Sequence, residues 1–210
     1  MLGFIKKDLL MIKSNIKILA ILLLIYVVMA FQGQMDLSFL LPFMSVMIMM
    51  STFSYDSYNK WDAYAISLPD GRKSSVKAKY LATIILIIVT TIIITALSFM
   101  ISYAKTNAID FENITGTIFG SLFATILLQS LIYPAMYKFG PEKARIALMT
   151  IIFVVAIIGG FITQYIDFSS IINILNFIEA YWVIVFLIAM ILMLYISYKI
   201  SERIYFKKEI

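Results

Sequence analysis

Long apolar runs separated by short polar connections make up most of the chain. Six of the runs come close to the length of about 20 residues that an α-helix needs to cross a bilayer. They cover residues 17–32, 37–54, 81–104, 114–137, 146–165 and 180–199. The pattern predicts an all-α integral membrane protein with six transmembrane helices, organised as a single domain over residues 1–210.

Positive charges alternate between the two sides that these helices define. Of the 17 lysines and arginines, all but Lys105 fall at the two ends of the chain or in the connections between runs two and three and between runs four and five. Because cytoplasmic connections retain Lys and Arg, both termini are predicted to be cytosolic. A cleaved signal peptide at the first run would put the alternation out of phase, and no convincing cleavage site follows that run.

The N-terminal residues 1–16 have the pattern of an amphipathic helix. Its apolar residues recur at steps of three and four, whereas Lys6 and Lys13 lie off that stripe. This predicts a helix in the inner membrane interface, with its lysines near anionic headgroups. A plain anchor for the first span is an equally open interpretation. The stripe consists of Leu2, Ile5, Leu9, Ile12 and Ile16.

Residues 55–80 form the most informative connection. Tyr55, Tyr58, Trp61 and Leu68 recur at helical spacing, which predicts an interfacial helix with one aromatic face. The sequence Pro69-Asp70-Gly71 predicts a turn, and a basic run over 72–79 leads into the third span. From these residues alone, the segment is either a docking surface for a cytosolic partner or an ordinary interface loop.

The connection 138–145 lies on the same predicted side. It contains Gly140-Pro141, which indicates a turn, and Glu142 then suits the first turn of a new helix. The two connections together would give the cytosolic face two docking points.

Composition narrows the chemistry that the chain can perform. Hydrophobic residues make up 62% and charged residues 14%, and there is no cysteine and no histidine. This removes thiol nucleophiles, imidazole bases and the usual zinc ligands. A membrane-embedded protease would then need an acidic pair within the spans, and the runs contain none. The sequence also lacks a Gly-x-x-x-x-Gly-Lys-Ser/Thr phosphate loop, so any role driven by ATP requires a separate ATPase.

Polar residues inside the predicted spans are few and uncharged, which argues against ion coupling and suits amphipathic or lipid-like cargo. The fourth run also has a Gly-x-x-x-Gly pattern at Gly116 and Gly120 that lets two helices approach closely. Packing within one subunit and a dimer seam are both open interpretations of it. The polar residues include Thr90, Thr91, Thr125, Gln129 and Ser130.

The segment 55–80 contains two motifs, Asn59-Lys60-Trp61-Asp62-x-Tyr64-Ala65-x-Ser67-Leu68-Pro69 and then Arg72-Lys73-x-x-Val76-x-x-Lys79-Tyr80-Leu81. With these motifs it resembles permease subunits of type-2 ATP-binding-cassette (ABC) exporters, in the bacterial branch of phenol-soluble modulin exporters. The six-span plan with an amphipathic start is also similar. Two departures are Ser57, where the family suggests an acidic residue, and Asp70-Gly71, where it suggests a more apolar pair. They bear on which ATPase the chain pairs with.

The resemblance implies a multi-pass permease in the bacterial cell membrane that exports amphipathic peptides. It implies two copies of an ABC ATPase that bind ATP and Mg, no cofactor in this chain, and a second permease copy in a homodimer or close heterodimer. Membrane lipids are expected partners, and nucleic acid is not. A non-transporting partner, such as a peptide immunity or sensor protein, is the alternative.

In the resembled family, the cytosolic helix between spans two and three couples the permease to its ATPase, and the connection between spans four and five can form a second contact. The resemblance therefore implies a coupling role for Asp56, Asn59, Lys60, Trp61, Asp62, Tyr64, Ser67, Leu68, Pro69, Arg72, Gly140, Pro141 and Glu142.

Overall fold

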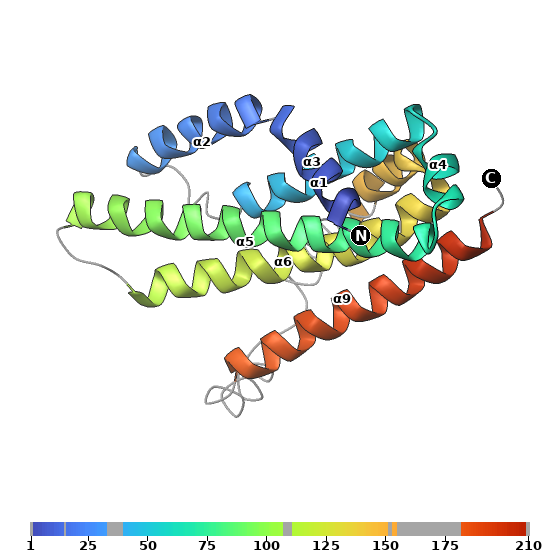
Figure 1. Cartoon of the computed structure of the whole chain (residues 1–210). Coiled ribbons are helices and arrows are strands. Elements are labelled where there is room, and N and C mark those ends of the chain that lie inside the picture. The colour runs from blue at the N-terminus through green and yellow to red at the C-terminus, as the bar shows by residue number, and fades with distance from the viewer. Residues whose placement is uncertain are drawn as a thin grey trace.

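The computed structural model describes residues 2–14, 16–32, 40–106, 111–150, 153–154 and 182–208. The regular secondary structure in these ranges is helical, which confirms the all-α prediction for them. Residues 141–150 form a helical segment after the last turn of α6. The other helices are α1 (Leu2–Ser14), α2 (Ile16–Phe31), α3 (Leu40–Tyr58), α4 (Trp61–Ser67), α5 (Gly71–Thr106), α6 (Phe111–Phe139) and α9 (Trp182–Lys207) (Figure 1).

Three of the described helices are long and apolar enough to cross a membrane on their own, over Gly71–Lys105, Ile114–Phe139 and Val183–Lys207. The pair Leu2–Lys13 and Ile16–Phe31, bent by 51°, is a fourth candidate if it counts as one span. The predicted fifth span, 146–165, lies mostly outside the described residues. The count of six spans and the cytosolic position of both termini therefore stay predictions.

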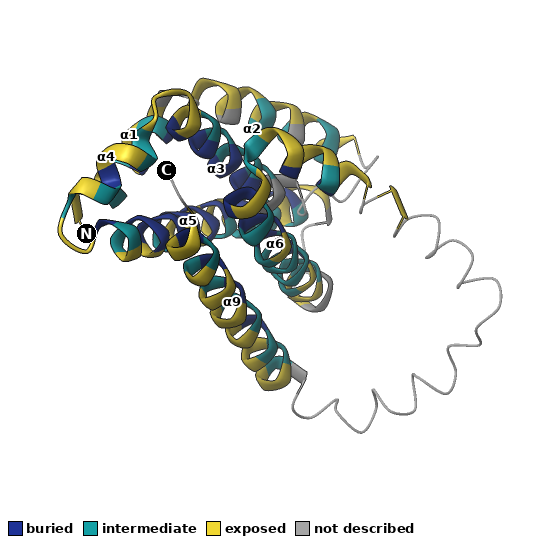
Figure 2. Ribbon diagram, turned by 90° about the vertical axis from the view of Figure 1, so that its right-hand side faces the viewer, coloured by how far each residue is buried: buried dark blue, intermediate teal, exposed yellow. Residues whose placement is uncertain are grey.

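α5 lies in the middle of the bundle. Its buried residues Val76, Tyr80, Thr83, Ile87 and Ile94 recur at steps of three, four and seven, the spacing of one helical face. Contacts with α1, α3, α6 and α9 surround α5. Figure 2 shows the buried residues gathered where α3, α5 and α6 meet, whereas exposed residues line much of α2 and α9. Exposed apolar side chains suit helices that face lipid tails.

Aromatic rings join four helices in the core. Phe53 of α3 packs edge-on against Tyr133 and Tyr137 of α6, with 5.2 Å between ring centroids in each pair. Tyr80 of α5 lies 5.0 Å from Tyr133, and Tyr205 of α9 lies 5.3 Å from Tyr137. Edge-to-face pairs at this spacing add to the energy of burial. The core is therefore strongest toward the ends of α3 and α9 and the start of α5.

Hydroxyl groups link α5, α6 and α9 inside the bundle. The Tyr80 hydroxyl lies 2.6 Å from Ser197 Oγ and 2.9 Å from Ser201 Oγ, and Ser197 Oγ donates to the Ser130 carbonyl at 2.8 Å. Such bonds hold helices together where water is excluded. Gln129 is fully buried, yet neither its amide nitrogen nor its oxygen has a hydrogen-bond partner in the described structure.

Two expectations about the position of helices change with the structure. A helix is present in the N-terminal stretch, but α1 buries Asp8 and Ile12 in the bundle, and Asp8 is not part of the predicted apolar stripe. α5 begins at Gly71, well before residue 81, so the basic run 72–79 is the first part of a long helix and not a loop that leads into it. Whether α1 lies in the membrane interface stays a prediction.

Candidate functional site

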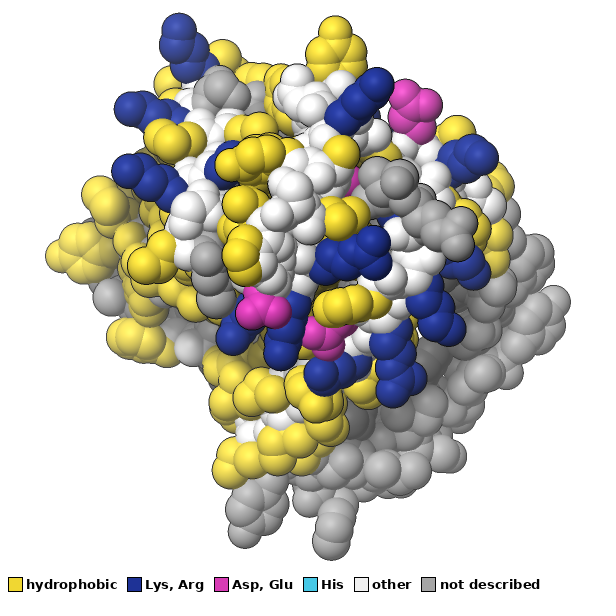
Figure 3. All heavy atoms as spheres, turned by 45° about the vertical axis from the view of Figure 1, so that its right-hand side comes forward, with side chains coloured by type: hydrophobic (Ala, Val, Ile, Leu, Met, Phe, Trp, Pro, Cys, Tyr) yellow, Lys and Arg dark blue, Asp and Glu magenta, His cyan; other side chains and the backbone are white. Residues whose placement is uncertain are grey.

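The residues named for coupling lie at one end of the bundle, which we call the α4 end. It comprises the end of α3, α4, the start of α5, residues 139–145 and the end of α9 (Figure 1). Figure 3 shows many lysine and arginine side chains spread over the face that includes this end, with few acidic side chains among them.

The prediction of one aromatic helix through Tyr55, Tyr58, Trp61 and Leu68 is wrong, because the helix is interrupted between Tyr58 and Trp61. α3 runs on to Tyr58, and Lys60 then takes a left-handed conformation with φ of 51°. The Lys60 amide donates to the Ser57 carbonyl at 3.3 Å, and α4 starts at the next residue. The short helix α4 can therefore point in a direction of its own.

The predicted turn after α4 is present, and its aspartate and its glycine have separate roles. The positive φ, 53°, belongs to Asp70, and the Gly71 amide donates to the Leu68 carbonyl at 3.0 Å. A Cβ atom on Gly71 would lie 1.6 Å from the carbonyl oxygen of Ala65. Gly71 is thus required by the close approach of α5 to α4.

Some of the coupling candidates point outward. Tyr64 is 55% exposed, and Tyr58, which was not among the candidates, is 87% exposed. The exposed candidates are Asn59, Lys60, Tyr64, Ser67, Pro69 and Glu142, and Leu68, Gly140 and Pro141 are partly exposed.

Asp62 and Arg72 instead bind the end of α9. Asp62 accepts hydrogen bonds from the Tyr205 hydroxyl and from Lys208 Nζ, each at 2.9 Å. Arg72 Nη1 donates to the carbonyl oxygen of Phe206 at 2.6 Å. α4 and the start of α5 are therefore fixed to the last turn of α9.

Trp61 packs against α1 and against a neighbour on α4. Its ring lies 5.9 Å from the ring of Phe4 on α1, and Lys7 Nζ lies 4.4 Å from the centre of the indole ring. Tyr64 is a third neighbour, with ring centroids 5.0 Å apart. The indole thus connects α4 to α1, which the sequence did not indicate.

Asp56 is buried in a closed ring of four charged side chains. It lies 2.5 Å from Lys7 Nζ and 2.7 Å from Lys79 Nζ. Asp8 completes the ring, with its Oδ1 atom 3.1 Å from Lys7 Nζ and 2.9 Å from Lys79 Nζ. Lys79 also donates to Thr52 Oγ1 at 2.8 Å. We call these four residues, Lys7, Asp8, Asp56 and Lys79, the charge ring.

A groove of ≈ 710 Å³ brings the two predicted cytosolic connections together. Arg145 Nη2 donates to Ser54 Oγ at 3.0 Å across it. Gly140, with φ of 83°, lets the chain turn from α6 into the helical segment 141–150. The lining residues are Ser54, Tyr55, Ser57, Tyr58, Phe139, Gly140, Pro141, Glu142, Lys143 and Arg145.

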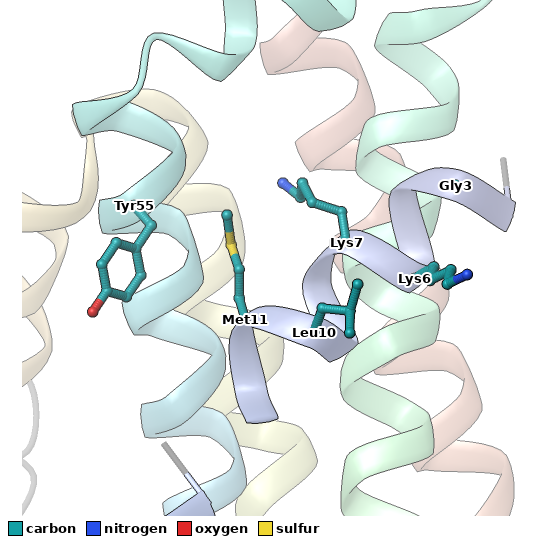
Figure 4. A pocket seen from close by; sticks show the side chains of 6 residues that line it. All are labelled: Gly3, Lys6, Lys7, Leu10, Met11 and Tyr55. Carbon is teal, nitrogen blue, oxygen red and sulfur yellow. The ribbon is translucent and has the colours of Figure 1, made fainter. Parts of the chain in front are cut away.

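A second hollow of ≈ 660 Å³ lies between α1 and the end of α3. Figure 4 shows that Lys6 and Lys7, although neighbours on α1, point in opposite directions along it. Tyr55 lines both hollows, so the end of α3 forms the wall between them. The second hollow is lined by Gly3, Lys6, Lys7, Leu10, Met11 and Tyr55.

The comparison with protein families decides what kind of protein has this arrangement. The family model of the ABC-2 family transporter protein matches residues 3–206. The chain belongs to this family. No curated protein and no solved structure matches the chain. The chain is thus a permease subunit of an ABC transporter and a multi-pass membrane protein. Membership of the family implies that its partner is an ABC ATPase.

In this ABC-2 permease, the glycine pattern of α6 is not used for packing by the described part of the chain. Gly116 and Gly120 are exposed, and a Cβ atom on either would meet nothing within 4 Å. Packing within the subunit is therefore not seen at these glycines, and the dimer seam stays a prediction.

The charge ring is the part of the ABC-2 permease that sequence reasoning missed. Lys79 was interpreted as one of the loop cations that set the topology, yet only 3% of its side chain is exposed. One signal was present, because Asp8 is the single acidic residue among the four lysines that precede residue 18. An isolated acid in a basic amphipathic helix is a reason to look for a buried partner.

Proposed function

We propose that this ABC-2 permease is the membrane subunit of an exporter and that its separate ATPase docks on the α4 end. The groove between the end of α3 and residues 139–145 is the observation that supports this most directly. Two connections far apart in the sequence, which the charge alternation predicts to be on one side, line a single hollow there. A rigid partner surface could press on both at once.

The groove also has the side chains that protein interfaces use. Tyr58 and Phe139 are 87% and 52% exposed, and both line it. Exposed aromatic side chains dominate the binding energy of many interfaces once a partner covers them. Lys143 and Glu142 add charges of both signs at the rim, which would guide the partner to one orientation.

The coupling candidates then divide into two groups with different work. Outward residues such as Lys60, Tyr64 and Glu142 would contact the ATPase. Inward residues such as Trp61 and Asp62 would pass its movement to α1 and α9 through the contacts described above. This division replaces the single list of contact residues that the sequence suggested.

The remaining features of the assembly follow from the same proposal. Two ATPase copies, which hold ATP and Mg, would lie beneath two permease copies in a bacterial plasma membrane, with both termini of each permease cytosolic. The open α6 surface at Gly116 and Gly120 supports a second copy as a neighbour, since small residues let helix backbones approach closely.

The cargo we propose is an amphipathic peptide or a lipid-like molecule. The three apolar spanning candidates support it, because their buried polar groups are hydroxyls and the Gln129 amide, with the charged Lys79 held at the α4 end. A small hydrophilic solute would need more polar groups along its path.

Co-purification tests the proposal. The full chain is co-expressed with each candidate ABC ATPase of the same organism in turn, and any complex is isolated in detergent and placed in liposomes. We expect a stable complex whose ATP hydrolysis depends on the permease. If none of these ATPases binds the chain, and the chain leaves the hydrolysis by each unchanged, the proposal is contradicted.

Transport is measured in the same liposomes with a fluorescent amphipathic helical peptide and a fluorescent phospholipid. ATP-dependent movement of either probe supports an exporter and separates the two cargo classes. If ATP is hydrolysed and neither probe moves, the cargo proposal is wrong and a non-transporting role gains support.

A further inference from the structure

The charge ring is closed and neutral. Each lysine contacts both aspartates, at distances from 2.5 to 3.1 Å. The exposed side-chain fractions are 1% for Asp8, 3% for Lys79, 8% for Asp56 and 17% for Lys7. Two positive and two negative groups are thus removed from solvent together at the junction of α1, α3 and α5.

Stability alone does not account for such a ring. Removing charges from water is costly, and apolar side chains of similar volume often fill the same space at no loss. Buried ionic groups are better at fixing one alignment of elements, because a shifted alignment leaves a charge unpaired. The ring therefore defines the position of α1 relative to α3 and α5 more sharply than apolar packing would.

The ring also reaches the helix on which the ATPase is proposed to act. Lys7, a member of the ring, lies over the Trp61 indole, and Phe4, one turn earlier on α1, packs on the edge of the same indole. α4 is thus held to α1 by an aromatic and a cation–π contact, and α1 is held to α3 and α5 by the ring.

We propose that Lys7, Asp8, Asp56 and Lys79 are positioning residues that make α1 move as one body with α4 and with the adjoining ends of α3 and α5. A push on α4 would shift Trp61, and with it Lys7 and the whole of α1. Because α1 leads into α2, the movement would reach that apolar helix. This inference rests on the proposed function, since it requires an ATPase that moves α4.

Paired spin labels test this joint movement without knowledge of the cargo. The chain has no cysteine, so pairs of labels can be placed at Gly3→Cys on α1, Ser67→Cys on α4 and Leu131→Cys on α6, all exposed positions, with α6 as the reference because it contributes no residue to the ring. Distances are measured in the complex with its ATPase, with and without ATP and vanadate, and labelled chains are diluted with unlabelled ones. With the wild-type ring, we expect the distances from residue 131 to residues 3 and 67 to change together and the distance between residues 3 and 67 to stay constant.

Lys7→Met should break this joint movement, so that residue 67 still moves on trapping and residue 3 does not follow. Lys6→Met is the matched control, because Lys6 is the adjacent lysine, is exposed and has no hydrogen bond or ion pair in the described structure. We expect it to behave as the wild type does. If a lone unpaired charge prevents folding of the Lys7 variant, the double variant Lys7→Met with Asp56→Leu leaves Asp8 paired with Lys79 and should also lose the joint movement.

The outcomes separate the inference from the proposed function. If the ATPase binds and residue 67 moves while residue 3 follows it in the Lys7→Met and double variants as well, the ring does not position α1 and the inference is wrong. If trapping moves residue 67 in no variant and not in the wild type, the ATPase does not act on α4 and the proposed function is contradicted instead.

Discussion

Asp62 of α4 accepts a hydrogen bond from the hydroxyl of Tyr205 at 2.9 Å, although 143 residues separate them in the sequence. Tyr205 is fully buried among the aromatic rings of the core, and Asp62 is at the surface of the α4 end. The bond therefore connects the proposed docking helix to the best-packed part of the bundle. As long as this hydrogen bond is present, α4 can move only together with the end of α9.

Tyr205→Phe removes this bond, together with the bond between the hydroxyl and Ser75, and keeps the packing of the ring. We expect the free energy of unfolding to fall by about 1–2 kcal/mol, since one hydrogen bond usually has a net value of about 1 kcal/mol. Unfolding in a detergent titration with SDS measures it. Lys208→Ala is the control: its partner Asp62 is 30% exposed and Lys208 itself 42% exposed, so that pair should contribute less. An equal fall in the free energy of unfolding in the two variants would show that the buried hydroxyl contributes no more than the exposed ion pair does.

Tyr58→Ala tests the docking groove. An exposed aromatic residue that becomes covered typically contributes about 2 kcal/mol, so the affinity for the ATPase should fall about 30-fold. Binding is measured with the purified permease and ATPase by fluorescence titration. Tyr195→Ala is a matched control, since Tyr195 is 59% exposed on α9 and does not line the groove. An unchanged affinity in Tyr58→Ala, with Tyr195→Ala also unchanged, would exclude Tyr58 from the interface.

Gly71→Ala should destabilise the fold at the junction of α4 and α5. The added methyl group would clash with the Ala65 carbonyl, and overpacking of this kind costs about 1–3 kcal/mol. Gly3→Ala on α1 has open space and should be neutral or stabilising by up to about 1 kcal/mol, since alanine is the better helix former. Thermal unfolding of the two variants side by side measures the difference. The opposite order would contradict the close approach of α4 and α5.

Gln129→Leu should raise the stability of the chain. The amide is buried with no hydrogen-bond partner among the described residues, and an unsatisfied polar group costs about 1–3 kcal/mol. Thr125→Val is the control one turn earlier, where the hydroxyl donates to the Ser121 carbonyl at 2.7 Å and its removal should bring no gain. A loss of stability in Gln129→Leu would mean that the amide is bonded in the membrane after all.

Gly116→Leu with Gly120→Leu tests the second permease copy. Two bulky side chains on one face of α6 would hold a facing helix apart, so the dimer fraction should fall while the monomer folds as before. Single-molecule photobleaching in liposomes counts the copies. Met100→Leu, an exposed change on α5, should leave the count as it is. A dimer that persists in the double variant would place the seam elsewhere.

Hydropathy predicted the helices whose boundaries follow from apolar length. α2, α6 and α9 lie where the first, fourth and sixth runs were expected, because each contains a long run that only a helix can bury in lipid. The early start of α5 was not predictable in this way. Its first residues are polar, and helical structure there depends on the turn at Asp70 and on contacts with α4 and α9.

The candidate site was predictable as a region and not as a set of roles. The resemblance located 55–80 and 138–145, and the structure brings parts of both to one groove. It could not show that Asp62 and Arg72 turn toward α9, or that Trp61 turns toward α1, since those partners lie far away in the sequence. The charge ring could not be predicted for the same reason, because Asp8 and Lys79 are 71 residues apart.

Arg72 binds the main chain of α9 at Phe206, and not the side chain of that residue. The final carbonyl groups of a helix have no partner within it and carry partial negative charge, so an arginine from another helix caps them. The carbonyl is the same whatever side chain occupies position 206. The link between α5 and α9 therefore tolerates substitution at that position, but not a chain that unwinds or ends before it.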